Sequence, residues 1–411
     1  MFLYAARQPL LDREQNLIAY EIIFRNGNFF EEADAATAAS KLVAASQFEK
    51  ALPDLTAGKP AHVKFSYQSL VRQYPTMIPT DQLVIEITEV TTPDEHLLKE
   101  CKALKEDGYN IVISGHDLQD WSEYFPYVAM MKLDFSRYCD DDLLCMREAK
   151  ERHSHLKLIG ANIDNTEQFF FAKAAGFDYF QGQFFCQYKP LESVSEDEND
   201  YSLAELLFEV SNLIVDSQEL IDKVQTDENL KSHILHYSNS SHFKSKNTTI
   251  EQALARLGKE ELIKAVSIVF TAQISSQAIG SKSPELLTIS LTRAKFAEEL
   301  AAAYSKKVTN KTSVDRSAAF LTGMFSLIDV MLDQPLSVVI EKLKLTEKVS
   351  GALLQNQGEL ASLIEITRSY EKADWLTVEL ICIELCLTRE DVAQSYKKAV
   401  QHVLNKVGEN K

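Results

Sequence analysis

A change in the pattern of apolar residues near residue 200 constrains the fold of this chain more than any other feature. Before it, short apolar runs alternate with stretches of helical spacing, whereas after it apolar residues recur almost only at helical spacing. The two patterns meet at residues 191–200, an acidic stretch typical of a linker or an exposed domain boundary. We therefore expect two domains, at residues 1–195 and 201–400, which also suits a chain of 411 residues.

The first half predicts a (β/α)8 barrel. A strand followed by a helix, repeated, indicates parallel strands joined by crossovers, and seven or eight such units before residue 190 favour a closed barrel over an open sheet. An open dinucleotide-binding sheet would need a GxGxxG turn, which the sequence lacks. The strand candidates are Leu17–Phe24, His62–Phe65, Leu83–Thr88, Asn110–Ile113, Ala129–Leu133, Lys157–Ile163 and Tyr179–Phe180.

The second half predicts an all-helical domain, without the fixed repeat of a solenoid. Helix candidates of the first half are Ala35–Phe48, His96–Asp107 and Thr166–Ala175. Those of the second half are Ser202–Val210, Ile250–Leu257, Glu260–Gln273, Pro284–Tyr304, Ala318–Leu332, Leu336–Leu343, Thr346–Leu354, Glu359–Tyr370 and Trp375–Leu387.

Composition narrows the class of protein. The net charge of −17 repels phosphate backbones and so excludes a broad nucleic-acid-binding surface. No basic region precedes a long apolar run, and no stretch reaches the ~20 apolar residues of a membrane span, so neither a signal peptide nor a transmembrane helix is expected. Six cysteines form no CxxC pair, which favours buried, reduced thiols over zinc or disulfides. These features predict a cytoplasmic protein.

Two glutamates interrupt strand candidates of the barrel. Glu21 and Glu86 each stand inside an otherwise apolar run. Barrel enzymes carry their working groups where strands end, so we interpret these carboxylates as the remnant of a site rather than as a solvated rim. A buried carboxylate needs a counter-charge, which Arg25, Lys64 or Lys132 is expected to supply.

Short motifs along the first half, taken in order, resemble the EAL-type cyclic-di-GMP phosphodiesterases. The matching motifs are Gln8-Pro9, Glu21-Ile22-Ile23 in place of Glu-Ala-Leu, Glu86-Ile87-Thr88-Glu89, Lys132-Leu133-Asp134 and Gln181-Gly182. The resemblance spans residues 1–190 and implies a barrel in which two divalent cations activate water and brace the phosphodiester. The site residues of the family that this chain retains are Glu21, Glu86, Lys132, Asp134 and Gln181.

Four positions depart from the family pattern at the metal site. A metal-binding Asn falls on Lys64, paired Asp residues fall on Ser114 and Gly115, and a Glu falls on Ala161. An ammonium repels cations, and the loss of three carboxylates removes oxygens that Mg²⁺ requires. A two-metal centre and its catalysis are therefore not expected, and the Lys64 ammonium is an alternative occupant of the vacant cation position.

Two alternatives stay open for the retained residues. A single cation held by Glu21, Glu86 and Asp134 would give a phosphodiesterase with an unusual site, for which Mg²⁺ or Mn²⁺ would be the cofactor. Arg25, Glu21 and Gln181 would instead bind cyclic di-GMP without hydrolysing it. Apart from the first alternative, no cofactor is expected.

The second half resembles the HDOD domain. The motifs that carry this resemblance include Asp-Glu-Asn-Leu at 227–230, Tyr-Ser-Asn-Ser at 237–240 and the run Phe320–Asp329. Metal-dependent HD hydrolases need adjacent His and Asp ligands, and Ser326 and Leu327 occupy that place here. His233 and His236 have no carboxylate at matching spacing. The resemblance therefore implies a protein-interaction module rather than a second enzyme.

The order of the two halves is similar to that of the EAL–HDOD signalling proteins, the YuxH-like family. This resemblance implies a non-catalytic regulatory protein that is linked to cyclic-di-GMP signalling in motility or biofilm control and recruits protein partners through its helical domain. A cyclic-di-GMP phosphodiesterase and a non-hydrolysing cyclic-di-GMP effector are the alternatives. A homodimer is a further option for its assembly.

Overall fold

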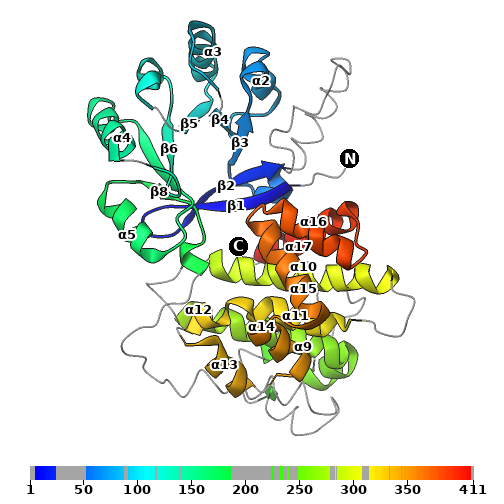
Figure 1. Ribbon diagram of the computed structural model, residues 1–411. Helices are drawn as coiled ribbons and strands as arrows, with labels where there is room; N and C mark the ends of the chain where they lie inside the picture. Colours follow the sequence, from blue (N-terminus) through cyan, green and yellow to red (C-terminus); the bar gives the residue numbers. More distant parts are fainter. Residues whose placement is uncertain are drawn as a thin grey trace. The chain divides into compact units, whose positions relative to one another are not determined.

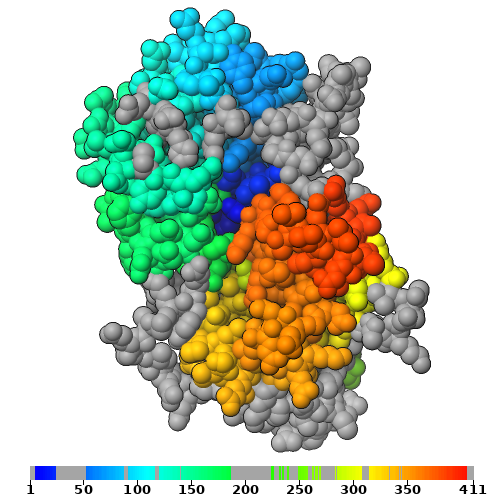
Figure 2. Space-filling model, in the orientation of Figure 1, coloured from blue at the N-terminus to red at the C-terminus, as the bar shows by residue number. Residues whose placement is uncertain are grey.

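The structure, a computed structural model, describes parts of both halves of the chain, which are coloured in Figures 1 and 2. The chain forms two compact units: Met1–Phe185 with Ser369–Trp375 and Leu404–Lys411, and Cys186–Arg368 with Leu376–Val403. The described residues are 5–24, 52–87, 91–115, 118–138, 140–186, 224–225, 231–232, 234–235, 238–239, 249–277, 283, 285–307, 314–332, 334–343 and 345–408. Outside them lie the expected helices 35–48 and 202–210, the stretch 191–200, and Arg25, Glu89, His233 and His236.

Eight strands close into a barrel in the order of the sequence (Figure 1). Neighbouring strands from β2 to β8 are parallel, whereas β1 is antiparallel to both β2 and β8. The predicted fold class, an α/β barrel followed by a helical domain, is confirmed. The strands are β1 (Ala5–Leu11), β2 (Leu17–Phe24), β3 (Ala61–Phe65), β4 (Leu83–Ile87), β5 (Asn110–Ser114), β6 (Met130–Asp134), β7 (Lys157–Ala161) and β8 (Tyr179–Phe180).

Strand β1, which contains Pro9, was not predicted. Asp12 makes the turn that joins β1 to β2. Its Oδ1 accepts hydrogen bonds from the backbone N–H groups of Glu14 and Asn16, at 2.9 and 2.8 Å. Antiparallel strands can follow one another through such a short turn, without a crossover helix. A hairpin rather than a strand–helix unit therefore supplies one strand of the barrel.

Side chains inside the barrel lie in two layers, because alternate residues of a strand point to the same face. One layer is apolar and contains Leu10, Ala19, Val84, Val112 and Ile159, with Met130 and Tyr179 packed against it. Two residues further toward the carboxyl ends of the parallel strands come Glu21, Glu86, Ser114, Lys132, Ala161 and Gln181. The strand period thus places a mostly polar layer next to an apolar one.

Helices follow most of the strands, and three of them, one of which is capped by Ser66, begin at side-chain caps. The side chains of Asp94 and Asn165 accept hydrogen bonds from the backbone N–H groups of Leu97 and Gln168, at 2.7 and 2.9 Å. The expected helices 96–107 and 166–175 are confirmed to within two residues. The helices are α2 (Tyr67–Val71), η1 (Tyr74–Met77), α3 (Glu95–Glu106), η2 (Leu118–Tyr124), α4 (Asp140–Arg152), α5 (Thr166–Ala174) and η3 (Phe184–Cys186).

The second half is helical as predicted, although its helices are divided differently. One continuous helix replaces the two expected between 250 and 273, and the expected helix 318–332 is interrupted by a 3-10 turn. The helices are α9 (Ile250–Gln277), α10 (Glu285–Lys307), α11 (Arg316–Met324), η5 (Phe325–Leu327), α12 (Ile328–Leu332), α13 (Leu336–Leu343), α14 (Glu347–Gln355), α15 (Gly358–Glu371), α16 (Trp375–Glu384) and α17 (Arg389–Gly408).

Helix α17 was not predicted, although the sequence carries its start signal. The Asp391 N–H donates to Thr388 Oγ1 at 3.2 Å, and the Thr388 N–H donates to Asp391 Oδ2 at 2.8 Å, as in a capping box. The expectation of buried cysteines is confirmed for Cys101 and Cys382, whereas Cys145 and Cys186 are half-buried and Cys386 is exposed. No helix among the described residues is both long and apolar enough to span a bilayer.

Helices α10 and α11 cross closely at Gly323. A Cβ atom at this position would lie 2.5 Å from the carbonyl oxygen of Arg293 and 2.6 Å from the Cα of Ala294. Real Cβ atoms do not approach backbone that closely, so only glycine allows this separation of the two helices.

Replacing Gly323 by alanine is therefore expected to destabilise the protein by about 1–3 kcal/mol, because backbone of α10 would have to move. Gly351→Ala in α14 is the matched control. An added Cβ meets nothing within 4 Å there, so this change should stabilise the helix by about 0.5–1 kcal/mol. Urea unfolding followed by circular dichroism measures both variants, and equal stabilities would contradict the close crossing.

Candidate functional site in the barrel

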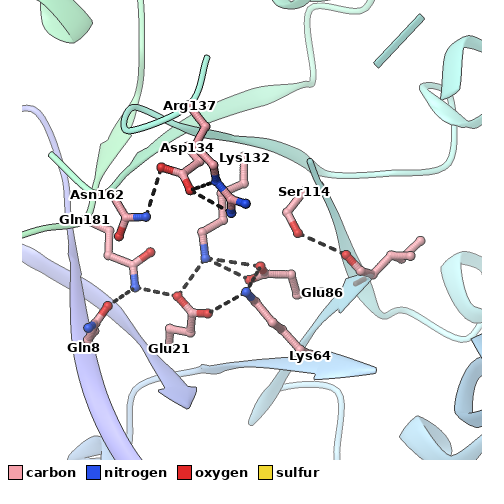
Figure 3. A network of polar contacts seen from close by, with 11 residues as sticks. Gln8, Glu21, Lys64, Glu86, Ser114, Lys132, Asp134, Arg137, Asn162 and Gln181 are labelled. Carbon is pink, nitrogen blue, oxygen red and sulfur yellow. Dashed lines mark hydrogen bonds and ion pairs between the residues drawn. The ribbon is translucent and has the colours of Figure 1, made fainter. Parts of the chain in front are cut away.

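The polar layer brings together four charged side chains from four strands (Figure 3). They are Glu21 on β2, Lys64 on β3, Glu86 on β4 and Lys132 on β6. Each lysine lies within ion-pair distance of both glutamates. The counter-charges expected for the two carboxylates are thus present, and the cluster is formally neutral when all four groups are ionised.

Glu21 is 5% exposed and is stabilised as a carboxylate. Its Oε2 accepts hydrogen bonds from Lys132 Nζ at 2.7 Å and from Gln181 Nε2 at 2.5 Å, and Lys64 Nζ lies 3.7 Å from Oε1. Burial by itself would raise the pKa of Glu21. The two ammonium charges and the hydrogen bonds outweigh burial and lower this pKa to about 2.

Glu86 is fully buried, and its pKa shifts in the direction opposite to that of Glu21. Lys132 Nζ donates to both of its carboxylate oxygens at 3.2 Å, and Lys64 Nζ lies 3.8 Å from Oε1. Burial raises the pKa of Glu86, and the charge of Glu21 adds to that rise against the opposing effect of the lysines. The two carboxylates share Lys132 and therefore take up protons as a coupled pair.

The two lysines differ in their environment. The Lys132 side chain is 8% exposed; burial alone would lower its pKa, but the two carboxylates raise it, so its ammonium stays charged. The Lys64 side chain is 35% exposed and reaches the same carboxylates at longer distances. Lys132 is therefore the buried centre of the cluster, and Lys64 is its solvent-accessible cation.

Gln181 is positioned by the glycine that follows it. Gly182 has a φ of 149°, and a Cβ there would lie 2.1 Å from the carbonyl oxygen of Ile163. The Ile163 N–H donates to the Gln181 carbonyl at 3.0 Å across this close approach. The Gln181 side chain donates to both Gln8 Oε1, at 3.0 Å, and Glu21. The Gln-Gly pair thus holds one amide against the buried carboxylate.

Asp134 makes its hydrogen bonds to residues outside the charge cluster. Its carboxylate accepts hydrogen bonds from the Ser136 N–H at 2.9 Å, Ser136 Oγ at 2.6 Å, Arg137 Nε at 3.1 Å and Asn162 Nδ2 at 3.0 Å. Burial opposes these contacts, yet they lower the pKa of Asp134. Ser136 and Arg137 were not singled out from the sequence, although both are near enough in the chain to reach Asp134.

Of the positions that depart from the family pattern, Ser114 and Ala161 lie in this layer, and Gly115 directly follows Ser114. Ser114 Oγ donates to the Ile87 carbonyl at 3.1 Å, and Ala161 is the β7 residue paired with Asp134. Gly115 has a φ of 135°, a conformation that residues with a Cβ rarely adopt. At these three positions the chain therefore offers a hydroxyl, a methyl group and a backbone glycine, none of which is an acidic ligand.

His62 was missed from the sequence. It pairs in register with Glu21 on the neighbouring strand and precedes Lys64 by two residues, so strand period would have placed it inside the barrel. It is 4% exposed, and burial together with the charge of Lys132 lowers its pKa to about 3. His62 is therefore a neutral group next to the charge cluster.

These residues do not fit a pair of divalent cations. Glu21 and Glu86 already neutralise two ammonium groups, and Asp134 is held by a guanidinium, a hydroxyl and an amide. In the described part of the chain, no three His, Cys, Asp or Glu side chains are grouped so that they could hold a metal ion. A cation would have to displace Lys64 or Lys132 before it could bind.

Ser326 in the helical half is likewise bonded to protein groups. Its Oγ donates to the Gly323 carbonyl at 2.8 Å and accepts a hydrogen bond from Arg293 Nη1 at 3.2 Å. Burial raises the pKa of Asp329. A hydroxyl and a guanidinium therefore hydrogen-bond each other at the position where this chain has Ser326 in place of a histidine.

The fold and the site define a class of protein: a closed α/β barrel with a neutralised charge cluster inside it, followed in sequence by a helical domain. Residues 202–332 match the HDOD domain family. The chain is 30% identical over 403 residues to the cyclic di-GMP phosphodiesterase CdgJ of Vibrio cholerae. This alignment covers 96% of this chain and 91% of CdgJ. The chain therefore belongs to the same family as CdgJ.

Other known proteins match more distantly. YuxH of Bacillus subtilis is 29% identical over 422 residues, with 98% of each chain covered. Among solved structures, an EAL domain protein from Listeria monocytogenes covers 44% of this chain and 86% of its own, at 16% identity and a TM-score of 0.33. BlrP1 of Klebsiella pneumoniae covers 44% and 55%, at 20% identity and a TM-score of 0.35. The barrel itself is established by its strand pairing.

Replacing Lys132 by methionine should be far more destabilising than replacing Lys64. Lys132→Met removes the buried counter-charge of two carboxylates and is expected to cost about 3–5 kcal/mol of unfolding free energy. Lys64→Met removes a cation that is one-third exposed, which should cost about 1 kcal/mol or less. Urea unfolding at pH 7 measures both, and the reverse order would show that Lys64 is the principal counter-charge.

His62 gives the protein a pH dependence whose sign follows from its lowered pKa. The unfolded chain protonates this histidine near pH 6.5, whereas the folded state keeps it neutral down to about pH 3. Its contribution to stability is therefore complete above pH 6.5 and is lost toward pH 3, at about 1.4 kcal/mol per pH unit. The difference in unfolding free energy between wild type and His62→Gln should fall by about 2 kcal/mol from pH 7 to pH 5. An unchanged difference would mean that His62 is not held neutral.

Proposed function

We propose that this protein is a non-catalytic regulatory component of cyclic di-GMP signalling. The link to cyclic di-GMP is supported by membership of the CdgJ family, since CdgJ is named as a cyclic di-GMP phosphodiesterase. The absence of hydrolysis is supported by one observation above all: Lys64 and Lys132 bind the carboxylates that a dication would need. Two-metal hydrolysis requires both metal ions to contact the reacting phosphate.

In this proposal the two halves have different roles. The barrel of residues 1–195 is a regulatory scaffold that uses no metal cofactor, and the helical domain of residues 201–400 recruits a protein partner. The match of residues 202–332 to the HDOD domain supports an interaction module in the second half. We place the protein in the cytoplasm and its output in motility or biofilm control.

The name of CdgJ favours a second candidate, a metal-dependent cyclic di-GMP phosphodiesterase with an unusual site. Such an enzyme would need Mg²⁺ or Mn²⁺ to displace Lys64 from Glu21 and Glu86. A non-hydrolysing effector that holds cyclic di-GMP through Arg25, Glu21 and Gln181 would bind the dinucleotide without releasing product.

Incubating the full-length protein with cyclic di-GMP and Mg²⁺ or Mn²⁺ tests the proposal. No linear dinucleotide is expected from the wild type, and turnover at enzyme-like rates would establish the phosphodiesterase instead. Calorimetric binding of cyclic di-GMP without turnover would assign the effector.

A triple variant, Lys64→Asn with Ser114→Asp and Ala161→Glu, provides the positive control. It returns oxygen donors to three positions while leaving the Gly115 backbone unchanged. This variant is expected to bind Mn²⁺ in calorimetry at concentrations where the wild type does not. Equal Mn²⁺ binding by both proteins would show that the lysine does not exclude cations.

A further inference from the structure

Helix α16 is labelled in Figure 1. Seven of its ten residues, Trp375 to Glu384, are apolar, and they lie on two opposite faces of the helix. One face is packed against the protein: Val378 and Cys382 are 0% and 5% exposed, and Leu385, just after the helix, is 5% exposed. A helix that is apolar all round normally lies inside a protein. Only one side of α16 is buried in this way, and its other apolar side is exposed to solvent.

Three large aliphatic side chains form the exposed face. Leu376, Leu380 and Ile383 are 70%, 60% and 76% exposed and are separated by four and three residues. This alternation of four and three keeps side chains on one line along a helix, and it is the spacing at which paired helices contact each other. We call these three residues the α16 stripe.

The charges around the α16 stripe are mostly negative. The helix contains no lysine, arginine or histidine, and the stretch 371–390 has five acidic residues against two basic ones. Arg389 neutralises Glu379 through an ion pair of 2.7 Å. Glu384 is exposed beside the stripe and makes no ion pair with any residue that the structure describes.

We propose that the α16 stripe binds an amphipathic helix of a partner protein that carries apolar residues at the same spacing and Lys or Arg beside them. Apolar side chains would cover the stripe, and a basic side chain would pair with Glu384. A second copy of this chain is a poorer fit, because it would bring another unpaired Glu384 and a further net charge of −17.

The proposed interface is small and separate from the HDOD match. Three side chains provide far less than the ~800 Å² per partner of a standard interface, so the complex is transient. Helix α16 also lies beyond residues 202–332. The proposal therefore holds whether or not the barrel hydrolyses cyclic di-GMP, and its test does not involve the dinucleotide.

Two synthetic helical peptides of about 20 residues provide the probe, since shorter isolated helices are marginal in water. Both carry leucines at alternating spacings of four and three; one has lysines beside the leucines and the other has glutamates. Fluorescence anisotropy with the full-length protein should show the lysine peptide binding at least about tenfold more tightly. Similar affinities for the two peptides would overturn the proposal.

Surface variants locate the binding. Leu380→Asp should weaken the lysine peptide at least about tenfold, and Glu384→Lys should reverse the preference between the peptides. Leu354→Asp on α14, where the leucine is 43% exposed, is the matched control and should bind like the wild type. Circular dichroism checks that each variant is folded.

Two further results would contradict the proposal. If Leu380→Asp and Leu354→Asp bind the lysine peptide equally, the stripe is not the contact. If the wild type alone sediments as a dimer that Leu380→Asp dissociates, a second copy occupies the stripe instead.

Discussion

A carboxylate buried in a protein needs a nearby positive charge, and in this barrel the Lys132 ammonium supplies it to Glu21 and Glu86. Strand period carries Glu21, Glu86 and Lys132 to one layer next to an apolar layer, where water cannot compensate their charges. The arrangement of the interior follows from that need: Lys132 lies between both carboxylates, Gln181 supplies a further donor, and His62 stays neutral. The same ion pairs occupy both carboxylates, so a cation at this position would compete with Lys64 and Lys132.

Family membership and local chemistry point to different parts of the function. The alignment with CdgJ, over 96% of this chain and 91% of that protein, argues that the two chains share their overall domain order. Lys64, Ser114 and Ala161, none of which carries a carboxylate, bear only on the proposed absence of the reaction. A barrel can lose a reaction and keep its fold, because the groups that bind metal are not the apolar groups that hold the strands together.

The elements that follow from the spacing of apolar residues could be predicted from the sequence. The contacts that depend on one side-chain hydrogen bond could not. The alternation of strands and helices predicted the barrel, and the polar residues at strand ends predicted the position of the Glu21 and Glu86 cluster. Strand β1 was not predicted, although it pairs with β2 along its whole length, Pro9 included. The separation of Asp134 from the cluster could not be seen, because it depends on rotamers that bring Ser136 and Arg137 to its carboxylate. Helix α17 was not predicted, although Thr388 and Asp391 form a capping box that could have indicated its start.

The backbone conformation at Gly115 limits which residues this position can hold. Side chains at Lys64 or Ser114 can be exchanged without altering the path of the chain, but a φ of 135° leaves no comfortable place for a Cβ. An acidic residue at position 115 would require a different backbone conformation there, and not only a different side chain. Substitution at Ser114 can thus be made on the existing backbone, whereas a carboxylate at position 115 needs a different backbone conformation.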